Sequence, residues 1–510
     1  MKQPDRVDHA AAAAAFIDKP AHVAFHDKRL WDLRSKRDAQ TQGIAEWETL
    51  RSVASNIKEH TLSHLADYLA RFADRAEANG VVVHWAADAE EHNAIVHRLL
   101  AERGMTSLVK SKSMLTDECR MRDYLEPRGI AVMETDLGER IQQLDGQDPS
   151  HMVVPAVHKL RDDVAALFGR TIGTDPANSD IHYLAESQRM HTRPYFVRAR
   201  TAGMTGCNFA VAETGTVVVC TNEGNADLSA NVPALHIASI GIEKLIPSIA
   251  DLGVFIRMLS RSALGSPITQ YTSHFRAPRP GTEMHYILVD NGRSERLAMD
   301  DFWHSLKCIR CGACMNTCPV YRRSGGLSYG GTYSGPIGAI INPTYDLKRY
   351  SALPFASTLN GSCTQVCPVR INIHEQIYKW RQVIAVEHEV PLVKAEVLKM
   401  AGKLLASPTL YRATVVSMGS ALRRLPNFVL YNPLNIWGRQ RTLPDAPAQT
   451  FHQWYKANRL GTRDAKPHPQ TDRSASLTAD AGTGPAANTK ARTDKAPEGA
   501  GRGDDAAPRQ

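Results

Sequence analysis

The chain has 510 residues and a mass of 56.2 kDa, which predicts two to four domains at roughly 100–200 residues each. It is 43% hydrophobic and 22% charged, which excludes a wholly disordered or fibrous protein. The net charge of +8 is spread without a dense basic block, and no apolar run approaches the roughly 20 residues that span a bilayer. We therefore expect a cytoplasmic protein without a transmembrane segment and without nucleic acid as its partner.

Residues 1–78 are predicted to form a helical N-terminal region. Apolar residues from Ile57 to Phe72 recur at steps of three to five, which is typical of one face of an amphipathic helix. Asn79 and Gly80 then provide a left-handed helix stop.

From residue 79 to 298, short apolar runs alternate with helical patterns. We predict strands at 81–86, 107–114 and 130–136, with helices at 88–104 and 118–129 between them. Such alternation is typical of an α/β domain with a mostly parallel sheet. Three further stretches extend the domain: a strand–helix unit at 151–169, two strands around a turn within 206–225, and a strand then a helix at 234–248.

This α/β domain carries no nucleotide-binding signature. It lacks a G-x-G-x-x-G turn after a strand and lacks a P-loop. A tightly bound dinucleotide or nucleoside triphosphate is therefore not expected.

Six of the nine cysteines lie within 60 residues, whereas Cys119, Cys207 and Cys220 are scattered and are expected to be small buried residues. The clustered cysteines form a C-x2-C-x2-C-x3-C-P motif at 308–319 and a C-x3-C-P motif at 363–368. In a cytoplasmic protein this clustering indicates metal binding rather than disulfides. Structural zinc is the alternative, but zinc sites usually use two ligand pairs separated by a spacer. The motif therefore predicts iron–sulfur clusters.

In two-cluster ferredoxins the fourth cysteine of such a motif ligates the other cluster. By this rule a four-iron cluster, called cluster 1, takes Cys308, Cys311, Cys314 and Cys367. Cys318 and Cys363 belong to a second, called cluster 2. Two four-iron clusters need eight thiolates, and Asn360 stands at C-x2-C spacing before Cys363, where an amide oxygen is a weak ligand for iron. Cluster 2 is thus left open as a labile four-iron cluster, a three-iron cluster or none.

With these motifs, the chain resembles the lactate-utilisation iron–sulfur protein B family over about residues 20–460. Matching stretches include VKSKSMLTDE (109–118), METDLGERI (133–141), MTGCNFAVAETGTVVV (204–219) and CTQVCPVRINIHE (363–375). The resemblance implies an α/β domain (79–298) related to the sugar-isomerase and CoA-transferase fold. It further implies a helical, ferredoxin-like 4Fe-4S module (299–385) and a helical C-terminal segment (386–460).

The same resemblance implies a function. The chain would be an electron-transfer subunit, non-catalytic or co-catalytic, of a complex that oxidises L-lactate to pyruvate together with two companion proteins. The family pattern has cysteine where this chain has Asn360, which puts cluster 2 in question.

Two groups of residues outside the cysteines are further candidates. Glu213 follows an apolar strand, and relatives that transfer CoA use a glutamate nucleophile; the alternative is a turn residue at a hairpin tip. A pocket for an anion or a small carboxylate is predicted at the ends of the strands. Its candidate residues are Lys110, Lys112, His158, Lys159, Asn222 and Asn225. The alternative is a solvated strand edge.

These candidates define a rival interpretation of the whole chain: a small-carboxylate-binding or acyl-transfer protein whose cluster is structural or regulatory. His236 and His285 lie in apolar sequence and are expected to be core residues. Residues 461–510 lack large apolar side chains and are expected to be disordered.

Overall fold

The computed structural model describes residues 6–387, 390, 392–431 and 445–458. It divides into two compact units, residues 1–395 and 396–510, which we describe separately. The tail at 461–510 lies outside the described residues. Among the helices that are described, none combines the length and the apolar character that a membrane crossing needs.

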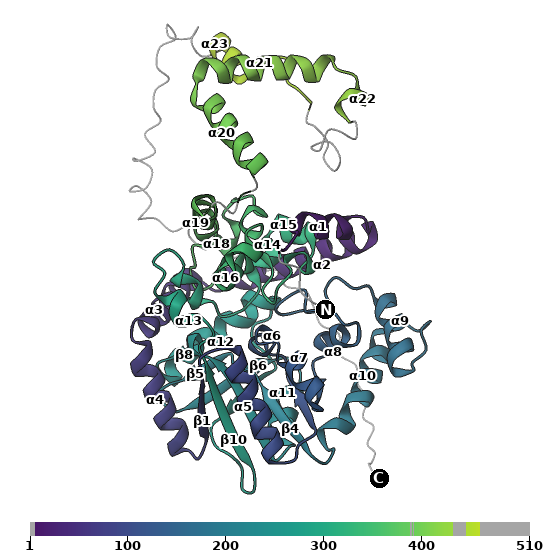
Figure 1. The fold of residues 1–510 in the computed structure, drawn as a ribbon, viewed down its shortest axis with the longest axis vertical. Coiled ribbons are helices and arrows are strands. Elements are labelled where there is room, and N and C mark those ends of the chain that lie inside the picture. The colour runs from purple at the N-terminus through teal and green to yellow at the C-terminus, as the bar shows by residue number, and fades with distance from the viewer. Residues whose placement is uncertain (1–5, 388–389, 391, 432–444, 459–510) are drawn as a thin grey trace, which may run out of the picture. The chain divides into compact units, whose positions relative to one another are not determined.

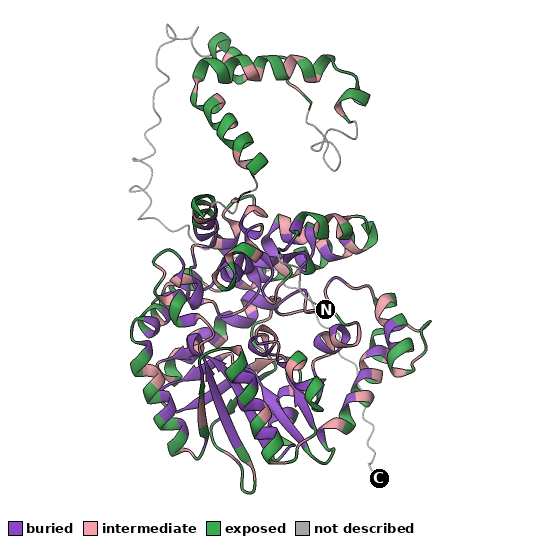
Figure 2. Ribbon diagram, viewed as in Figure 1, coloured by how far each residue is buried: buried purple, intermediate pink, exposed green. Residues whose placement is uncertain are grey.

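A six-stranded parallel sheet is the centre of the first unit (Figure 1). The two strands β10 and β7 are buried almost throughout, as the burial colours in Figure 2 show, because helices cover both faces of the sheet. In sheet order the strands are β1 (Val82–Ala86), β10 (Glu283–Val289), β7 (Leu235–Gly241), β4 (Thr201–Thr205), β2 (Ser107–Lys110) and β3 (Ala131–Glu134).

A smaller four-stranded sheet lies within the same domain. Its order is β8 (Leu245–Ile246), β5 (Phe209–Val211), β6 (Thr216–Thr221) and β9 (Tyr271–Phe275). The hairpin turn between β5 and β6 requires Gly215, which has a φ of +64°. A Cβ atom there would lie 2.4 Å from the backbone nitrogen of Ala76, so the hairpin tip packs directly on the preceding helix.

Helices surround the sheets and form the whole cysteine-bearing region. Helices α1 (His9–Ile17) and α2 (Pro20–Gln42) pack against the cysteine-bearing region, and α2 also contacts α12 (Ile249–Leu264) of the sheet domain. Around the sheets lie α3 (Trp47–Ser63), α4 (Leu65–Ala78), α5 (Ala89–Glu102), α6 (Met114–Glu118), α7 (Met121–Leu125), α8 (Leu137–Leu144), α9 (Arg161–Ile172), α10 (Ile181–Phe196), α11 (Asn225–Asn231), α12 and α13 (Arg293–Leu297). The cysteine region contains η3 (Trp303–Lys307), α14 (Ala313–Thr317), α15 (Pro319–Ser324), α16 (Gly335–Tyr345), α17 (Leu347–Tyr350), α18 (Ser362–Val366) and α19 (Ile373–Val386).

The N-terminal helices share a core with the cysteine region. Helix α2 packs against α12 of the sheet domain and against α14 and α15 of the cysteine region. One hydrophobic cluster accordingly contains Leu30, Phe255, Met315 and Trp380, from all three parts of the unit. The cysteine-bearing helices therefore have no core that is theirs alone.

The helical C-terminal segment follows as α20 (Leu392–Ala406), α21 (Pro408–Arg424), α22 (Asn427–Leu430) and α23 (Phe451–Asn458). Helices α21 and α23 contain no buried residue among those described.

The predicted elements at 81–86, 88–104 and 130–136 are confirmed as β1, α5 and β3. The strand expected at 107–114 ends at Lys110, because the Ser113 side chain caps α6 and starts a helix there. The helix expected at 118–129 is interrupted at Arg120, which has a φ of +52°.

The strand expected at 151–158 is wrong: these residues, all of them described, form turns. His151 Nδ1 accepts hydrogen bonds from the backbone amides of Val153 and Val154, at 3.0 and 3.2 Å. The imidazole thus binds amides that a strand would offer to its neighbour.

Candidate functional site

Four cysteines from two distant segments line one small cavity. Cys308 and Cys311 come from the loop that leads into α14, Cys314 lies in the first turn of α14, and Cys367 ends α18. The cavity has a volume of about 20 Å³, and the remainder of its lining is apolar except for the chain backbone. These are the four residues that the sequence rule assigns to one cluster.

The loop reaches this shape through two residues with left-handed backbone, Arg310 (φ +60°) and Gly312 (φ +74°). A Cβ atom on Gly312 would lie 2.9 Å from His151 Cε1, so glycine is required for the close approach. The amides of Arg310 and Ile371 each lie 3.4 Å from a cysteine sulfur, Cys308 and Cys367 respectively, and donate to it. Amide donors of this kind stabilise negative charge on cluster sulfurs.

Side chains of the N-terminal helices fasten the second segment. Arg51 Nε donates to the Cys367 carbonyl oxygen at 3.0 Å, and Arg37 Nη2 donates to that of Val366 at 3.0 Å. Burial raises the pKa of the thiols of Cys311 and Cys314, so without metal these groups stay neutral. Four soft donors that converge in an apolar shell fit a four-iron cluster.

The residues assigned to cluster 2 fit less well. Burial, and secondarily the charge interaction with Cys318, raise the pKa of Cys363 to about 12. Asn360 is exposed, and its Oδ1 already accepts a hydrogen bond from the Ser362 amide at 3.1 Å. Two thiols and an engaged amide do not match the four thiolates of a regular four-iron cluster.

Neither Cys207 nor Cys220 supplements this pair, because both line a different cavity, and Cys119 is buried beside the sheet. His374 lies nearer: its Nε2 is 3.9 Å from where a Cβ of Gly361 would stand, and its Nδ1 is 2.8 Å from Thr364 Oγ1. Of these cysteines and His374, only His374 offers a further ligand atom, Nε2, near the segment of Cys363.

A larger cavity, of about 330 Å³, opens at the carboxyl ends of the sheet strands. It brings together three of the six residues predicted for an anion pocket: Lys112, Asn222 and Asn225. It also contains Lys244 and Arg310, which sequence reasoning missed. Lys244 follows strand β7 and so carries the signal of a strand end, whereas Arg310 is hidden inside the cysteine spacing.

The other three predicted pocket residues lie elsewhere. Lys110 is buried against Glu134, with Nζ 2.9 Å from each carboxylate oxygen. Lys159 pairs with Asp145, and His158 Nδ1 lies 2.7 Å from Ser150 Oγ. The pocket thus combines Lys112 with residues of later segments, because β2 ends at Lys110 and the chain turns before Lys112.

The larger cavity adjoins the cysteine cavity. Met152 lines both of them, and Arg310 lines the larger one while standing between two cysteines of the smaller one in the chain. The Arg310 guanidinium lies over the Tyr333 ring at 4.4 Å and 3.5 Å from a Glu243 oxygen. Lys244 makes no hydrogen bond and no close ion pair within the described part of the chain, and the Glu243 carboxylate opposes the lowering of its pKa by burial. An anion in this cavity would therefore meet the Lys244 amino group beside the four-cysteine cavity.

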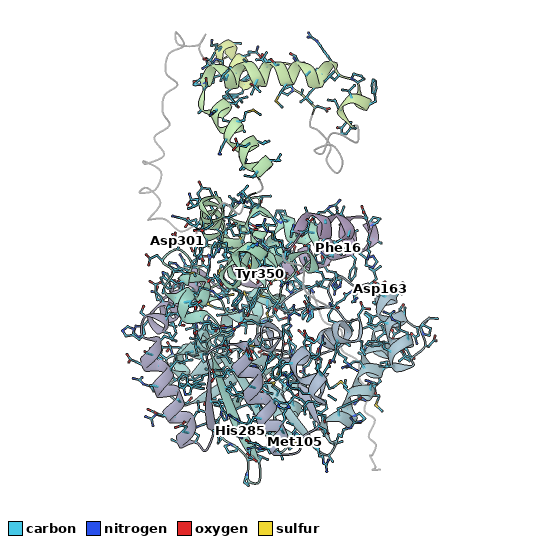
Figure 3. All side chains as sticks on the ribbon, in the orientation of Figure 1. Phe16, Met105, Asp163, His285, Asp301 and Tyr350 are labelled. Carbon is cyan, nitrogen blue, oxygen red and sulfur yellow. The ribbon has the colours of Figure 1, made fainter. Side chains whose placement is uncertain are left out.

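Glu213 is outside this cavity. It is exposed at the hairpin tip, where its Oε2 accepts a hydrogen bond from the Ile249 amide at 3.0 Å and so caps α12. Its surroundings agree with the turn-residue alternative. His236 and His285 are buried in the sheet domain, and Figure 3 shows His285 far from Tyr350 of the cysteine region.

Comparisons with known proteins match the sheet domain and the cysteine region to two different families. The chain matches the LUD domain family over residues 69–294 and a 4Fe-4S dicluster domain over residues 304–371. Lactate utilization protein B of Geobacillus thermodenitrificans (strain NG80-2) is 39% identical over 434 residues, covering 82% of this chain and 90% of that protein. The "uncharacterized electron transport protein YkgF" of Escherichia coli (strain K12) is 38% identical over 434 residues, 83% and 90% of the two chains. A DUF162 family crystal structure from Deinococcus radiodurans covers 44% of this chain and 98% of its own, with 13% identity and a TM-score of 0.24.

Proposed function

The chain belongs to the lactate utilization protein B family, and from this premise we propose that it is the iron–sulfur electron-transfer subunit of a system that oxidises L-lactate to pyruvate. The matched dicluster domain supports an iron–sulfur cofactor. The observation that carries the proposal is that four cysteines line one apolar cavity. Cys314 and Cys367 meet there although they lie 53 residues apart in the chain. Companion subunits of the same system would deliver or remove the electrons.

In this proposal cluster 1 is bound by Cys308, Cys311, Cys314 and Cys367. When bound, a four-iron cluster supplies one-electron transfer. The protein contributes the apolar shell, the amide donors at the sulfurs, and the arginines that hold the Cys367 segment. Cluster 2 is assigned to Cys318 and Cys363 and is the weaker site, since Asn360 offers no thiolate.

Anaerobic purification followed by iron and sulfide analysis and EPR tests this assignment. We expect roughly four to seven irons per chain and a reduced-cluster EPR signal that L-lactate elicits only when companion subunits are present. When a cysteine of either motif is replaced by serine, Cys119→Ser is the matched control, because that cysteine is buried away from both motifs. A protein that contains zinc and no sulfide would contradict the proposal.

A second function, binding of a small carboxylate, is favoured by the cavity beside cluster 1. Lys112, Lys244 and Arg310 supply positive charge there, and a volume of about 330 Å³ suits a small molecule. The two functions are compatible, because a bound carboxylate would lie next to the electron carrier. Acyl transfer through Glu213 lacks such support, since that residue caps a helix outside the cavity.

Titration calorimetry of the holo protein with L-lactate and with pyruvate tests carboxylate binding. Lys244→Ala should weaken binding at least tenfold, because it removes the Lys244 amino group from the cavity. Lys379→Ala is the matched control, since that lysine is exposed and pairs with Asp301. Equal affinity in both variants would exclude the cavity as the binding site.

A further inference from the structure

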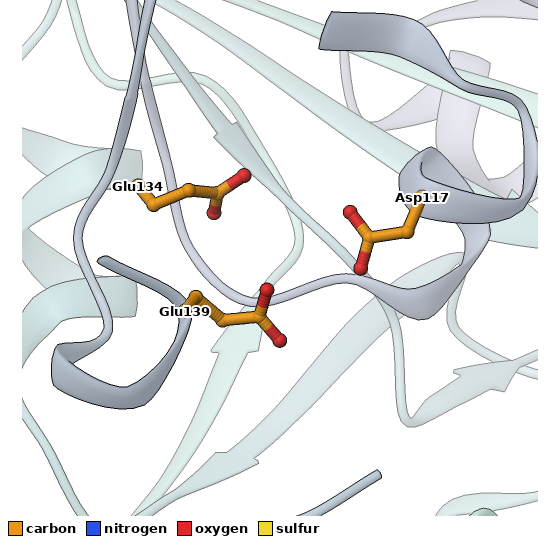
Figure 4. Close-up of side chains that lie close together, drawn as sticks. All are labelled: Asp117, Glu134 and Glu139. Atoms are coloured by element: carbon orange, nitrogen blue, oxygen red, sulfur yellow. The ribbon is translucent and has the colours of Figure 1, made fainter. Parts of the chain in front are cut away.

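A group of buried carboxylates lies at the carboxyl ends of β2 and β3, outside both cavities described above (Figure 4). Glu134 ends β3, Asp117 lies in α6 and Glu139 lies in the first turn of α8. One oxygen of each lies within 4.8 Å of the others. The proposed electron transfer makes no use of these residues.

The positive charge in contact with this group is smaller than its negative charge. Lys110 Nζ lies 2.9 Å from both Glu134 oxygens and 3.5 Å from Asp117 Oδ1. Lys112 and Arg122 attract the group through space, with no hydrogen bond to it. Arg122 also lines the cavity that the carboxylates line, together with Arg120, which pairs with Asp148. If all three carboxyl groups are ionised, the Lys110 ammonium leaves an excess of two negative charges in the group. Glu134 and Glu139 are only 4% exposed, and burial raises the pKa of both carboxyl groups. Such a charge is costly to bury unless a cation compensates it.

A separate observation points to a ligand at the same place. Gln142 is 1% exposed, and its Oε1 accepts no hydrogen bond from any described residue. Its Nε2 donates to the Asp148 carbonyl oxygen at 2.7 Å, which fixes the orientation of the amide, because a flipped amide would set two oxygens against each other. A buried acceptor left without a donor costs about 1–3 kcal/mol, so it calls for a partner.

Gln142 and the three carboxylate residues, Asp117, Glu134 and Glu139, line the same small cavity, of about 40 Å³. Asp117 Oδ2 also lacks a hydrogen-bond partner among the described residues. Glu139 and Gln142 stand three residues apart on α8 and so present their side chains on one face.

We propose that this cavity binds one small divalent cation of the Mg²⁺ or Mn²⁺ class. All four protein donors, Asp117, Glu134, Glu139 and Gln142, are oxygens, which hard cations prefer over softer metals. A charge of two offsets the uncompensated carboxylates, and the space accommodates one ion with about one water. The site is independent of the cysteines, so it goes beyond the proposed electron transfer.

Mn²⁺ binding to the EDTA-washed holo protein tests the proposal, with free Mn²⁺ measured from its six-line EPR signal. We expect one Mn²⁺ per chain, displaced by Mg²⁺, and at least a tenfold loss of affinity in Glu139→Gln. That variant keeps the side-chain shape and relieves repulsion, so it should fold. Glu186→Gln is the control, since Glu186 is exposed and pairs with Arg189.

Thermal unfolding gives a second readout: Mn²⁺ should raise the Tm of the unaltered protein and of Glu186→Gln, but not that of Glu139→Gln. Absence of Mn²⁺ uptake would overturn the proposal. Equal uptake in both variants would overturn it as well. Iron and sulfide content is measured in parallel, so a failure here is distinguishable from a failure of the iron–sulfur assignment.

Discussion

The sheet domain and the cysteine region of the first unit gain their shape in different ways. In the sheet domain, strands β7 and β10 bury nearly every residue, and the hydrophobic cluster that includes Leu108, Ile237 and Ile287 belongs to this domain alone. The cysteine region consists of short helices joined by residues with positive φ, among them Arg310, Leu359 and Arg370. Its apolar residues join a cluster that includes N-terminal helices.

Regular hydrogen bonding therefore stabilises the sheet, whereas the cysteine region depends on the N-terminal helices and on its proposed cofactor. Metal–ligand bonds are frequently a large part of the folding free energy of small metal-binding regions. Damage to the ligands should therefore loosen the cysteine region and spare the sheet.

The largest effect is expected from loss of a ligand to cluster 1. Cys311→Ser and Cys367→Ser should each remove the same EPR signal, despite their separation in the chain, because both residues line one cavity. Hydrogen exchange should rise across the cysteine region and stay low in β7 and β10. If the two variants lost different signals, the crossed assignment would be wrong.

The next effect is a gain of iron at cluster 2. Asn360→Cys restores a C-x2-C-x3-C-P spacing at 360–368, so it should raise iron per chain above the roughly four to seven expected for the unaltered protein and slow its loss in air. Asn372→Cys, on the far side of the Cys-Pro motif, serves as a control for an added thiol.

A stable eight-iron protein with Asn360 in place, unchanged by Asn360→Cys, would contradict the idea of a weak second site. His374 is then the residue to examine, because it lies beside Gly361. His374→Ala would lower the iron content in that case.

Dependence of the cysteine region on the N-terminal helices predicts a smaller effect. Arg51→Ala removes the buried donor to the Cys367 carbonyl oxygen and should cost about 2 kcal/mol, with faster loss of cluster 1 in air. Arg257→Ala breaks an exposed pair with Glu46 and should cost at most about 1 kcal/mol. Denaturant unfolding and cluster absorbance measure both quantities. Equal effects would mean that the N-terminal helices do not support the cluster.

The same contrast explains what the sequence could predict. Strands such as 81–86 were predictable because their pattern is local, and the cysteine spacing was informative because ligand geometry restricts it. The segment at 151–158 resembles a strand, yet its conformation depends on His151, whose Nε2 lies 3.0 Å from Asn316 Oδ1 in the cysteine region. A contact 165 residues distant in the chain leaves no local signal.

The candidate sites show the same limit. Lys112, Asn222 and Asn225 were predictable from their positions near strand ends, and the structure brings them together. Arg310 lines the same cavity because the cysteine loop lies next to the carboxyl ends of the strands. Lys110 does not line it, because its ammonium group is paired with Glu134. Pairing partners of this kind are decided by tertiary packing.

The smallest effect is expected from acid, at a histidine buried in the central sheet. Burial lowers the pKa of His236 in β7 to about 3, against 6.5 for an ordinary histidine. The unfolded chain therefore takes up a proton between these values while the folded sheet does not, so stability falls as pH drops below about 6.5. At pH 5.5 this one residue should cost about 1.4 kcal/mol relative to pH 8.

His236→Gln removes the titrating group and retains a donor toward Thr205 Oγ1, which lies 2.9 Å from the imidazole. Urea unfolding of the holo protein at pH 8.0 and 5.5 should show a pH dependence that is smaller by about 1.4 kcal/mol in this variant. His182→Gln, at an exposed position, is the control and should behave as the unaltered protein does. An undiminished pH dependence in His236→Gln would mean that acid destabilises the chain through groups other than His236.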